Sequence, residues 1–334
     1  MADMTRKKPT SYDVAKLAGV HRSAVSRAFS DGGSISAETK EKVMKAAKTL
    51  EYRVNFFARG LQKQNSGLVG IVASRLDTPY RAKQVKLASH ELIENGYTPI
   101  LLTVDKSDDV SGRMSSLLNY NISGMIVTSD TPPAKIIEEC IQYNIPVVLI
   151  NRDPSITGTD RIQLNIEDAG QLAFDMLCKA GATKFGVLMP QTQTYTVQGR
   201  AKIFAQKCRD AGFPITIIET QGQSYAAGTD ATQDVYEKLD DIDGIFCTTD
   251  LMAFGLLDGL RNQYNIAVPG QLKILGFDDV DQASWGAYNL STINQDIQQS
   301  AIAAVDLMMK RLETPLKPLE TRSILLTPIH RGTT

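Results

Sequence analysis

Short apolar runs alternate with helix-like stretches along most of the chain, and this alternation constrains the fold more than any other feature of the sequence. The runs lie at 68–73, 99–104, 124–129, 146–151, 184–189, 214–219, 244–249 and 273–277. Between them come stretches with the spacing of amphipathic helices. We therefore predict βαβ units, whose parallel strands are covered by helices on both faces. The runs fall into two series, which indicates two similar lobes.

Charge separates a small leading segment from this region. Residues 1–64 contain 13 lysines and arginines against 6 aspartates and glutamates, whereas the remaining 270 residues contain 23 against 31. Basic residues gain affinity for nucleic acid because they release its condensed counterions. We therefore expect the first segment to contact a polyanion and the second not to. The alternative is a basic tail that is merely solvated.

Composition and motifs exclude several classes of protein. With 334 residues, 43% of them apolar and 22% charged, the chain is typical of a globular protein of more than one domain. It has no apolar run of 18 residues and no apolar signal segment at its start, so we expect a cytoplasmic protein without membrane contact. Its four cysteines form no C-x-x-C pair, and phosphate-binding and hydrolase motifs are missing. We therefore expect no metal, no cofactor and no catalytic residues.

The basic segment has the spacing of three short helices. Thr10 and Asp13 fit a capping box, which predicts a helix start, and Gly19 permits a tight turn after that helix. Ser36 is the predicted cap of a third helix. The first helix is expected to turn three apolar side chains inward, namely Val14, Leu17 and Ala18. The second, over 21–29, is expected to expose Arg22, Ser23, Ser26 and Arg27.

The same residues resemble a known family. The order and spacing of several stretches are similar to those of the lactose-repressor (LacI/GalR) family: Thr10-x-Tyr12-Asp13-Val14-Ala15, Ala18-Gly19-Val20, Val25-Ser26-Arg27, Thr39-x-x-x-Val43, Tyr52-x-x-Asn55 and Ala58-Arg59-x-Leu61. The resemblance implies a DNA-binding helix-turn-helix head at 1–54, a hinge helix with its linker at 55–65, and a two-lobed effector-binding and dimerisation domain at 66–334. That domain is expected to have the α/β fold of type I periplasmic binding proteins, with doubly wound parallel sheets.

In such a head the second helix enters the major groove, with its first residues against the base edges. Arg22 is expected to read a base directly, because a guanidinium can bridge guanine O6 and N7. Ser23 is a base contact or a helix cap, and Arg27 a base contact or a phosphate clamp. The other candidates for DNA contact in the head are Tyr12, His21 and Ser26. His21 stands where the family has a capping serine, which predicts a weak start of the second helix.

The resemblance also implies minor-groove contacts from the hinge. The candidates are Asn55, Ala58, Arg59 and Leu61. Leu61 is expected to wedge into a base step and kink the duplex, the alternative being an ordinary contact onto the following domain. Val54 replaces the proline that is common before the hinge asparagine. Because so short a helix is marginal alone, we expect it to fold on DNA as one of a pair.

Ligands of open parallel sheets bind where the carboxyl ends of strands face a crevice. The resemblance selects eight candidates for effector contact: Tyr80, Arg81, Arg152, Asn165, Thr196, Tyr225, Asp250 and Asp278. Asp278 either accepts hydrogen bonds from a polyol or caps a turn. Asp250 is also a candidate helix cap, and Tyr225 a candidate for packing between the lobes. Trp285 lies near the cleft or the lobe interface. The chain is expected to pass between the lobes near 163–166 and 290–297.

Two departures from the family bear on the effector. Thr196 stands three residues before Gly199, where sugar-binding members have an arginine, and Asn165 stands where an aspartate is frequent. These departures disfavour a neutral sugar. Arg81 and Arg152 are expected to face the cleft, where guanidinium groups suit a carboxylate or phosphate; the alternative is that both form salt bridges. We therefore expect an acidic sugar derivative as effector.

Together these features predict a transcriptional regulator, most simply a repressor of a carbohydrate or sugar-acid operon in the bacterial cytoplasm. It is expected to bind a near-palindromic double-stranded operator as a homodimer, because one head meets only a few base pairs. Induction and co-repression are equally compatible with the sequence. The alternatives are a solute-binding protein for transport, which needs no basic head, and a sugar-acid enzyme on a Rossmann-like fold.

Overall fold

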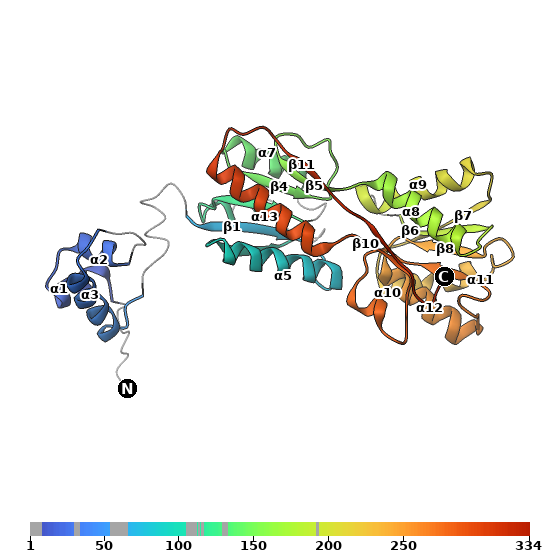
Figure 1. The fold of residues 1–334 in the computed structure, drawn as a ribbon, viewed down its shortest axis with the longest axis horizontal. Coiled ribbons are helices and arrows are strands. Elements are labelled where there is room, and N and C mark those ends of the chain that lie inside the picture. The colour runs from blue at the N-terminus through green and yellow to red at the C-terminus, as the bar shows by residue number, and fades with distance from the viewer. Residues whose placement is uncertain are drawn as a thin grey trace. The chain divides into compact units, whose positions relative to one another are not determined.

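The structure is a computed structural model that describes residues 9–29, 34–53, 66–104, 112, 114, 117–128, 133–191 and 194–334 (Figure 1). The chain divides into two compact units, Met1–Ser66 and Gly67–Thr334. The predicted hinge, 55–65, lies outside the described residues, so its boundaries stay a prediction. Among the residues described, no helix is both long enough and apolar enough to cross a membrane.

Three helices form the first unit: α1 (Ser11–Ala18), α2 (Arg22–Ala28) and α3 (Ala37–Thr49). The capping box is confirmed, because the Thr10 hydroxyl accepts from the Asp13 amide and the Asp13 carboxylate accepts from the Thr10 amide. Gly19 ends α1 with a φ of 65°, a left-handed conformation that glycine adopts without strain. The helices close around a small apolar core: Val14, Ala15, Val25, Ala28, Val43, Ala46 and Ala47.

The prediction for Leu17 is wrong, since 53% of this residue is exposed. Val14 and Ala15 are both buried, so the inward face of α1 is centred between them. An α-helix turns by about 100° per residue, which places Leu17 roughly 110° from that centre. Ala18 lies close to the centre and packs against the core.

Lobe 1 of the second unit is built on a six-stranded parallel sheet with the order β11-β5-β4-β3-β1-β2. Its strands are β1 (Leu68–Ala73), β2 (Thr98–Thr103), β3 (Gly124–Val127), β4 (Val147–Ile150), β5 (Asp160–Leu164) and β11 (Thr321–Ile324). Helices α5 (Pro79–Glu94) and α13 (Ile297–Glu313) pack together over one face of the sheet. Helix α7 (Ala134–Gln142) packs in the apolar cluster of the other face.

Lobe 2 is built on a four-stranded parallel sheet with the order β7-β6-β8-β9. Its strands are β6 (Phe185–Pro190), β7 (Ile215–Thr220), β8 (Gly244–Cys247) and β9 (Lys273–Leu275). Helices α8 (Ile166–Lys179) and α9 (Tyr195–Asp210) cover one face. The other face carries α10 (Tyr225–Asp230), α11 (Thr232–Tyr236) and α12 (Asp250–Tyr264), and a short 3-10 helix (Asp281–Ser284) follows β9.

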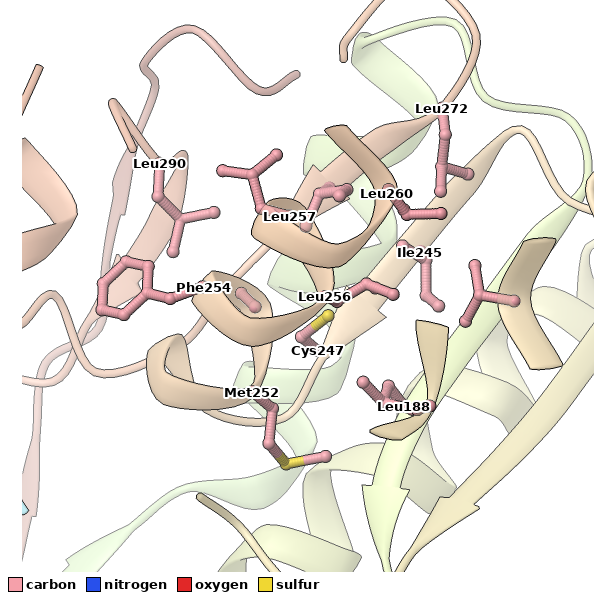
Figure 2. Packing of buried hydrophobic residues seen from close by; sticks show 14 of the residues in the cluster. Leu188, Ile245, Cys247, Met252, Phe254, Leu256, Leu257, Leu260, Leu272 and Leu290 are labelled. Carbon is pink, nitrogen blue, oxygen red and sulfur yellow. The ribbon is translucent and has the colours of Figure 1, made fainter. Parts of the chain in front are cut away.

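Helix α12 is the centre of this second layer. Figure 2 shows its side chains Met252, Phe254 and Leu257 among the apolar side chains that line the cluster, with Leu188 and Ile245 of the sheet beside them. Glycine allows the neighbouring α10 to come close: a Cβ atom on Gly255 would stand 2.0 Å from a backbone carbonyl oxygen of α10. The two predicted lobes are thus present, each with its own apolar core.

The chain crosses between the lobes three times, once more than predicted. It enters lobe 2 between β5 and α8 and returns between β10 (Thr292–Asn294) and α13. A third crossing leads from β11 to β12 (Thr327–Ile329), which pairs antiparallel with β10 and is drawn in red in Figure 1. We call these segments the first, second and third crossings.

A buried carboxylate fixes the sheet edge from which the third crossing starts. Asp160, 1% exposed at the start of β5, accepts from Arg311 Nε at 2.8 Å, Arg311 Nη2 at 3.0 Å, Lys317 Nζ at 3.2 Å and the Glu320 amide at 2.9 Å. Burial alone would raise the pKa of Asp160, but these hydrogen bonds outweigh it and hold that pKa below its usual range. The carboxylate therefore ties β5 to α13 and to the segment before β11.

Candidate functional site

The first candidate surface is the exposed side of α2. Arg22, Ser23, Ser26 and Arg27 are all exposed there, as predicted, while Val25 and Ala28 face the core. Three hydrogen bonds orient the arginines: Arg22 Nε donates to Ser11 Oγ at 3.2 Å, Arg27 Nε to the Ser23 carbonyl at 3.3 Å, and Arg27 Nη2 to Ser23 Oγ at 3.4 Å. Tyr12 of α1 is also exposed. Side chains that donate hydrogen bonds from a short helix are what a groove-reading surface requires.

The prediction of a weak start for α2 is wrong. His21 is the N-cap residue, and its Nδ1 accepts a hydrogen bond from the Ser23 amide at 3.3 Å. An unprotonated imidazole nitrogen is an acceptor like a serine oxygen, so the ring satisfies a first-turn amide that would otherwise lack a partner. The predicted contacts of Asn55, Ala58, Arg59 and Leu61 lie outside the described residues.

The second candidate site is a pocket between the two lobes. The empty space within it, including solvent at the open mouth, is about 740 Å³. Nearly all of its lining follows the carboxyl ends of strands or starts a helix, as expected for parallel sheets. The lining residues are Arg75, Thr78, Tyr80, Arg81, Thr128, Asn151, Thr194, Thr196, Val197, Arg200, Gln223, Thr249, Leu251, Asp278, Val280 and Gln295.

Half of the eight predicted effector contacts line this pocket. Tyr80 and Arg81 come from the first turn of α5, Thr196 from the first turn of α9, and Asp278 from the turn after β9. These four come from both lobes and converge on one space. Their role in binding stays a prediction.

The other four lie elsewhere. Asn165 is exposed and caps α8, accepting from the Glu167 and Asp168 amides. Tyr225 points away to donate its hydroxyl proton to Asp258 at 2.7 Å. Asp250 is completely buried beneath the pocket, and the cap of α12 is its neighbour Thr249.

Arg152 is the fourth of these residues. It lines a neighbouring depression formed with the first turns of α9, because the chain bends after β4 at Asn151, whose φ is 56°, and leaves the pocket there. Trp285, for which two places were open, is exposed and does not line the pocket.

Arg200 of α9 lines the pocket although it was not among the predicted effector contacts. It lies four residues after Thr196, hence on the same face of α9, and is only 2% exposed. Its guanidinium carbon stands 3.8 Å from the centroid of the Phe277 ring, Nη2 donates to the Thr248 carbonyl, and Asp278 Oδ1 is 3.9 Å from Nη2. The i to i+4 spacing from Thr196 was the signal in the sequence that pointed to Arg200.

The Tyr80 hydroxyl and Arg200 Nε are buried in the pocket and have no hydrogen-bond partner in the described part of the chain. Burial, followed by the charge of Asp278, raises the pKa of Tyr80, so this hydroxyl stays protonated and able to donate. Buried donors of this kind are expected to bind water or a ligand.

Charge in the pocket is predominantly positive. Three arginines, Arg75, Arg81 and Arg200, face one lining carboxylate, Asp278. Helices α5, α9 and α12 all begin at the pocket, and their partial positive ends add to this charge. Burial raises the pKa of Asp278 even though Arg200 and a hydrogen bond from Gln295 lower it.

Comparisons with known proteins match the first unit and part of the second. Residues 10–55 match the lacI family of bacterial regulatory proteins, and residues 174–334 match a periplasmic binding protein-like domain. The sucrose operon repressor of Pediococcus pentosaceus is 29% identical over 338 residues, which cover 98% of this chain and 99% of the relative.

Two solved structures share the fold. The Lac repressor dimer bound to operator and the anti-inducer ONPF has a TM-score of 0.86 at 23% identity and covers 98% of this chain and 99% of its own. A LacI-family transcriptional regulator from Enterococcus faecalis with bound ribose has a TM-score of 0.72 at 23% identity, covering 80% and 98%.

These findings agree with the predicted fold and with the prediction that the protein is not an enzyme, since the relative is a repressor. The helix-turn-helix head, the two-lobed unit and the match over nearly the whole length of a repressor lead to one conclusion: the chain has the domain composition of LacI-type repressors, a lacI-family head followed by a periplasmic binding protein-like domain.

Proposed function

We propose that this repressor binds its operator as a homodimer and that a small acidic sugar derivative in the interlobe pocket controls operator affinity. The observation that carries the proposal is the combination, in one chain, of an exposed arginine-bearing helix in a lacI-type head with a cationic pocket between two lobes. In this proposal residues 1–54 are the head, 55–65 the hinge and 66–334 the effector-binding and dimerisation unit.

The head supplies both direct reading and positioning. Arg22, at the start of α2, reads a guanine through its guanidinium, while Ser23, Ser26 and Arg27 contact bases or phosphates from the same side. Tyr12 and His21 position the head on the backbone. Hinge residues Asn55, Ala58, Arg59 and Leu61 add contacts in the minor groove. Two heads spaced by one helical turn explain a near-palindromic operator.

The pocket suits a ligand that carries both hydroxyl groups and negative charge. Asp278 accepts hydrogen bonds from hydroxyl groups, whereas Arg75 and Arg81 offer forked donors to a carboxylate or phosphate. The lining holds three guanidinium groups against one carboxylate, so an anionic ligand reduces repulsion among them. The sucrose relative and the ribose-bound regulator support a carbohydrate framework for the ligand.

The DNA part of the proposal is tested by selection from randomised duplexes, followed by fluorescence anisotropy at several salt concentrations. We expect Arg22→Ala to relax preference at one operator position by about 1–3 kcal/mol. Arg59→Ala, by contrast, is expected to weaken all duplexes similarly and to flatten the salt dependence. Equal behaviour of the two variants contradicts this division of roles, and wild-type protein without sequence preference contradicts the proposed function.

The effector part is tested by thermal shift with D-glucose, D-gluconate and D-glucose 6-phosphate. An acidic compound that binds raises the melting temperature, and D-glucose raises it less or not at all. Arg75→Gln is expected to remove the preference for the acid, because it removes a cation from the lining without disturbing the core. Arg209→Gln, an exposed change at the far end of α9, is the matched control. Preference for the neutral sugar contradicts the acidic-effector proposal.

A further inference from the structure

Gln295 lies in the second crossing and uses both atoms of its amide to join the lobes. Its Nε2 donates to Asp278 Oδ1 of lobe 2 at 2.6 Å, and its Oε1 accepts from Asn151 Nδ2 of lobe 1 at 3.4 Å. Asn151 Oδ1 in turn accepts from the Leu164 amide at 2.7 Å, where the first crossing begins. We propose that Gln295 is a positioning residue that couples the hydrogen bonding of Asp278 to the crossings between the lobes. We call this chain of hydrogen bonds, from Asp278 through Gln295 and Asn151 to the Leu164 amide, the relay, and we propose that it sets the repressor's response to its effector.

The turn that holds Asp278 has a further bond to the second crossing and one to the end of the third. Asp279 Oδ2 accepts from Asn294 Nδ2 at 2.8 Å in the second crossing, and Asp279 Oδ1 accepts from Arg331 Nη2 at 2.7 Å, two residues beyond β12. Asp278 and Asp279 have φ angles of 122° and 49°. Non-glycine residues persist in this region only where surrounding bonds hold them, and such strain is characteristic of ligand clamps and switches.

The position of the relay makes it sensitive to a ligand. Asn151, Asp278 and Gln295 all line the pocket, while Gln295 itself is only 5% exposed. A ligand hydroxyl that donates to Asp278 competes with Gln295 for the same carboxylate. Because the other end of the Gln295 amide holds Asn151, a change at Asp278 reaches lobe 1 through one side chain. A ligand that binds one arrangement better than the other shifts their populations.

This inference rests on the proposed function where operator affinity is measured, but not where hydrogen exchange is measured. The full chain carries each test variant. Gln295→Met removes both amide bonds and keeps the length of the side chain. Gln298→Met, an exposed change in the first turn of α13, is the matched control. In the double variant Gln295→Glu with Asp278→Asn, amide and carboxylate trade places, which restores the bond with its polarity reversed.

Hydrogen exchange of the Leu164 amide is the first readout, because it needs no effector. In Gln295→Met, Asn151 loses a partner, and we expect exchange in the segment 160–166 to become about two- to five-fold faster, as the loss of one hydrogen bond implies. Gln298→Met is expected to leave this rate unchanged, and the double variant to return it toward the wild-type rate. A purely structural role would instead speed exchange throughout both lobes and would not be rescued.

Operator affinity of the effector-free protein is the second readout, on a duplex selected with the wild type. We expect Gln295→Met to change this affinity at least about three-fold relative to Gln298→Met, because the relay biases the lobe arrangement. Unchanged exchange at Leu164, or absence of rescue, overturns the relay even if DNA binding is normal. If the wild type binds no duplex selectively, the proposed function fails, whereas the exchange result still decides the relay.

Discussion

Replacing Arg311 by methionine removes the main partner of the buried Asp160 and therefore measures what an uncompensated charge costs in this fold. Asp160 loses two charge-assisted hydrogen bonds and keeps only those from Lys317 and the Glu320 amide. Breaking a buried ion pair from one side costs about 3–5 kcal/mol. For a unit of this size, 1 kcal/mol corresponds to about 2–4 °C, so the melting temperature is expected to fall by roughly 6–20 °C.

The assay is thermal unfolding followed by circular dichroism at several pH values. In wild type the pKa of Asp160 is lowered, so this group contributes stability above the pKa of an unfolded aspartate, and the contribution is lost as the pH falls through the folded pKa. In Arg311→Met the remaining burial raises the pKa of Asp160. Protonation in mild acid then relieves the penalty, and the difference between variant and wild type shrinks as the pH falls.

A second variant decides whether charge is the cause. When Asp160→Leu is combined with Arg311→Met, no buried charge remains, and most of the lost stability is expected to return, since apolar replacements of buried pairs are often neutral. Arg209→Met is the exposed control and is expected to change stability by less than about 0.5 kcal/mol. A double variant no more stable than Arg311→Met alone would refute the reasoning.

Three further outcomes follow from described contacts. Gly255→Ala is expected to lower the free energy of unfolding in urea by roughly 3 kcal/mol, because the new Cβ atom would stand 2.0 Å from a backbone oxygen; an unchanged midpoint contradicts the close packing of α10 and α12. His21→Ala is expected to speed exchange of the Ser23 amide about five-fold, as loss of a cap worth about 1 kcal/mol implies, while His21→Asn preserves it; equal rates contradict the capping role. Lys83→Met breaks an exposed ion pair with Asp281 and is expected to change stability by at most about 1 kcal/mol; a larger loss contradicts its exposure.

The pattern of apolar residues in the sequence was sufficient to predict most of the strands in the two sheets. Each of the eight apolar runs overlaps a strand, and β1 has the predicted bounds. The missed strands are those without an apolar run. In β5 the polar residues Asp160 and Gln163 interrupt the pattern, and Asp160 is buried only because ionic partners arrive from segments about 150 residues away. Strands β10 and β12 have three residues each, too few for periodicity to be visible.

Residues that line the pocket could be predicted where their position relative to a strand or helix determines the direction of their side chains. Tyr80, Arg81 and Asp278 were found because they follow strands, whereas Arg152 comes after the bend at Asn151 and lines a neighbouring depression instead. Gln295 was missed because an amide in a crossing has no distinctive spacing. What makes it important is its simultaneous contact with two lobes, and such a contact exists only in the folded chain.

The three crossings also determine when lobe 1 can be finished during synthesis. Its sheet needs β11, whose residues pair with residues of β5 that lie 160 positions earlier in the chain, and its helix α13 is made only after the four-stranded sheet of lobe 2. Lobe 2 is almost contiguous in sequence. During translation, all four sheet strands of lobe 2 are therefore synthesised before lobe 1 is complete. In that interval lobe 1 still exposes the apolar face that α13 will cover. This is the interval in which a chaperone would be needed.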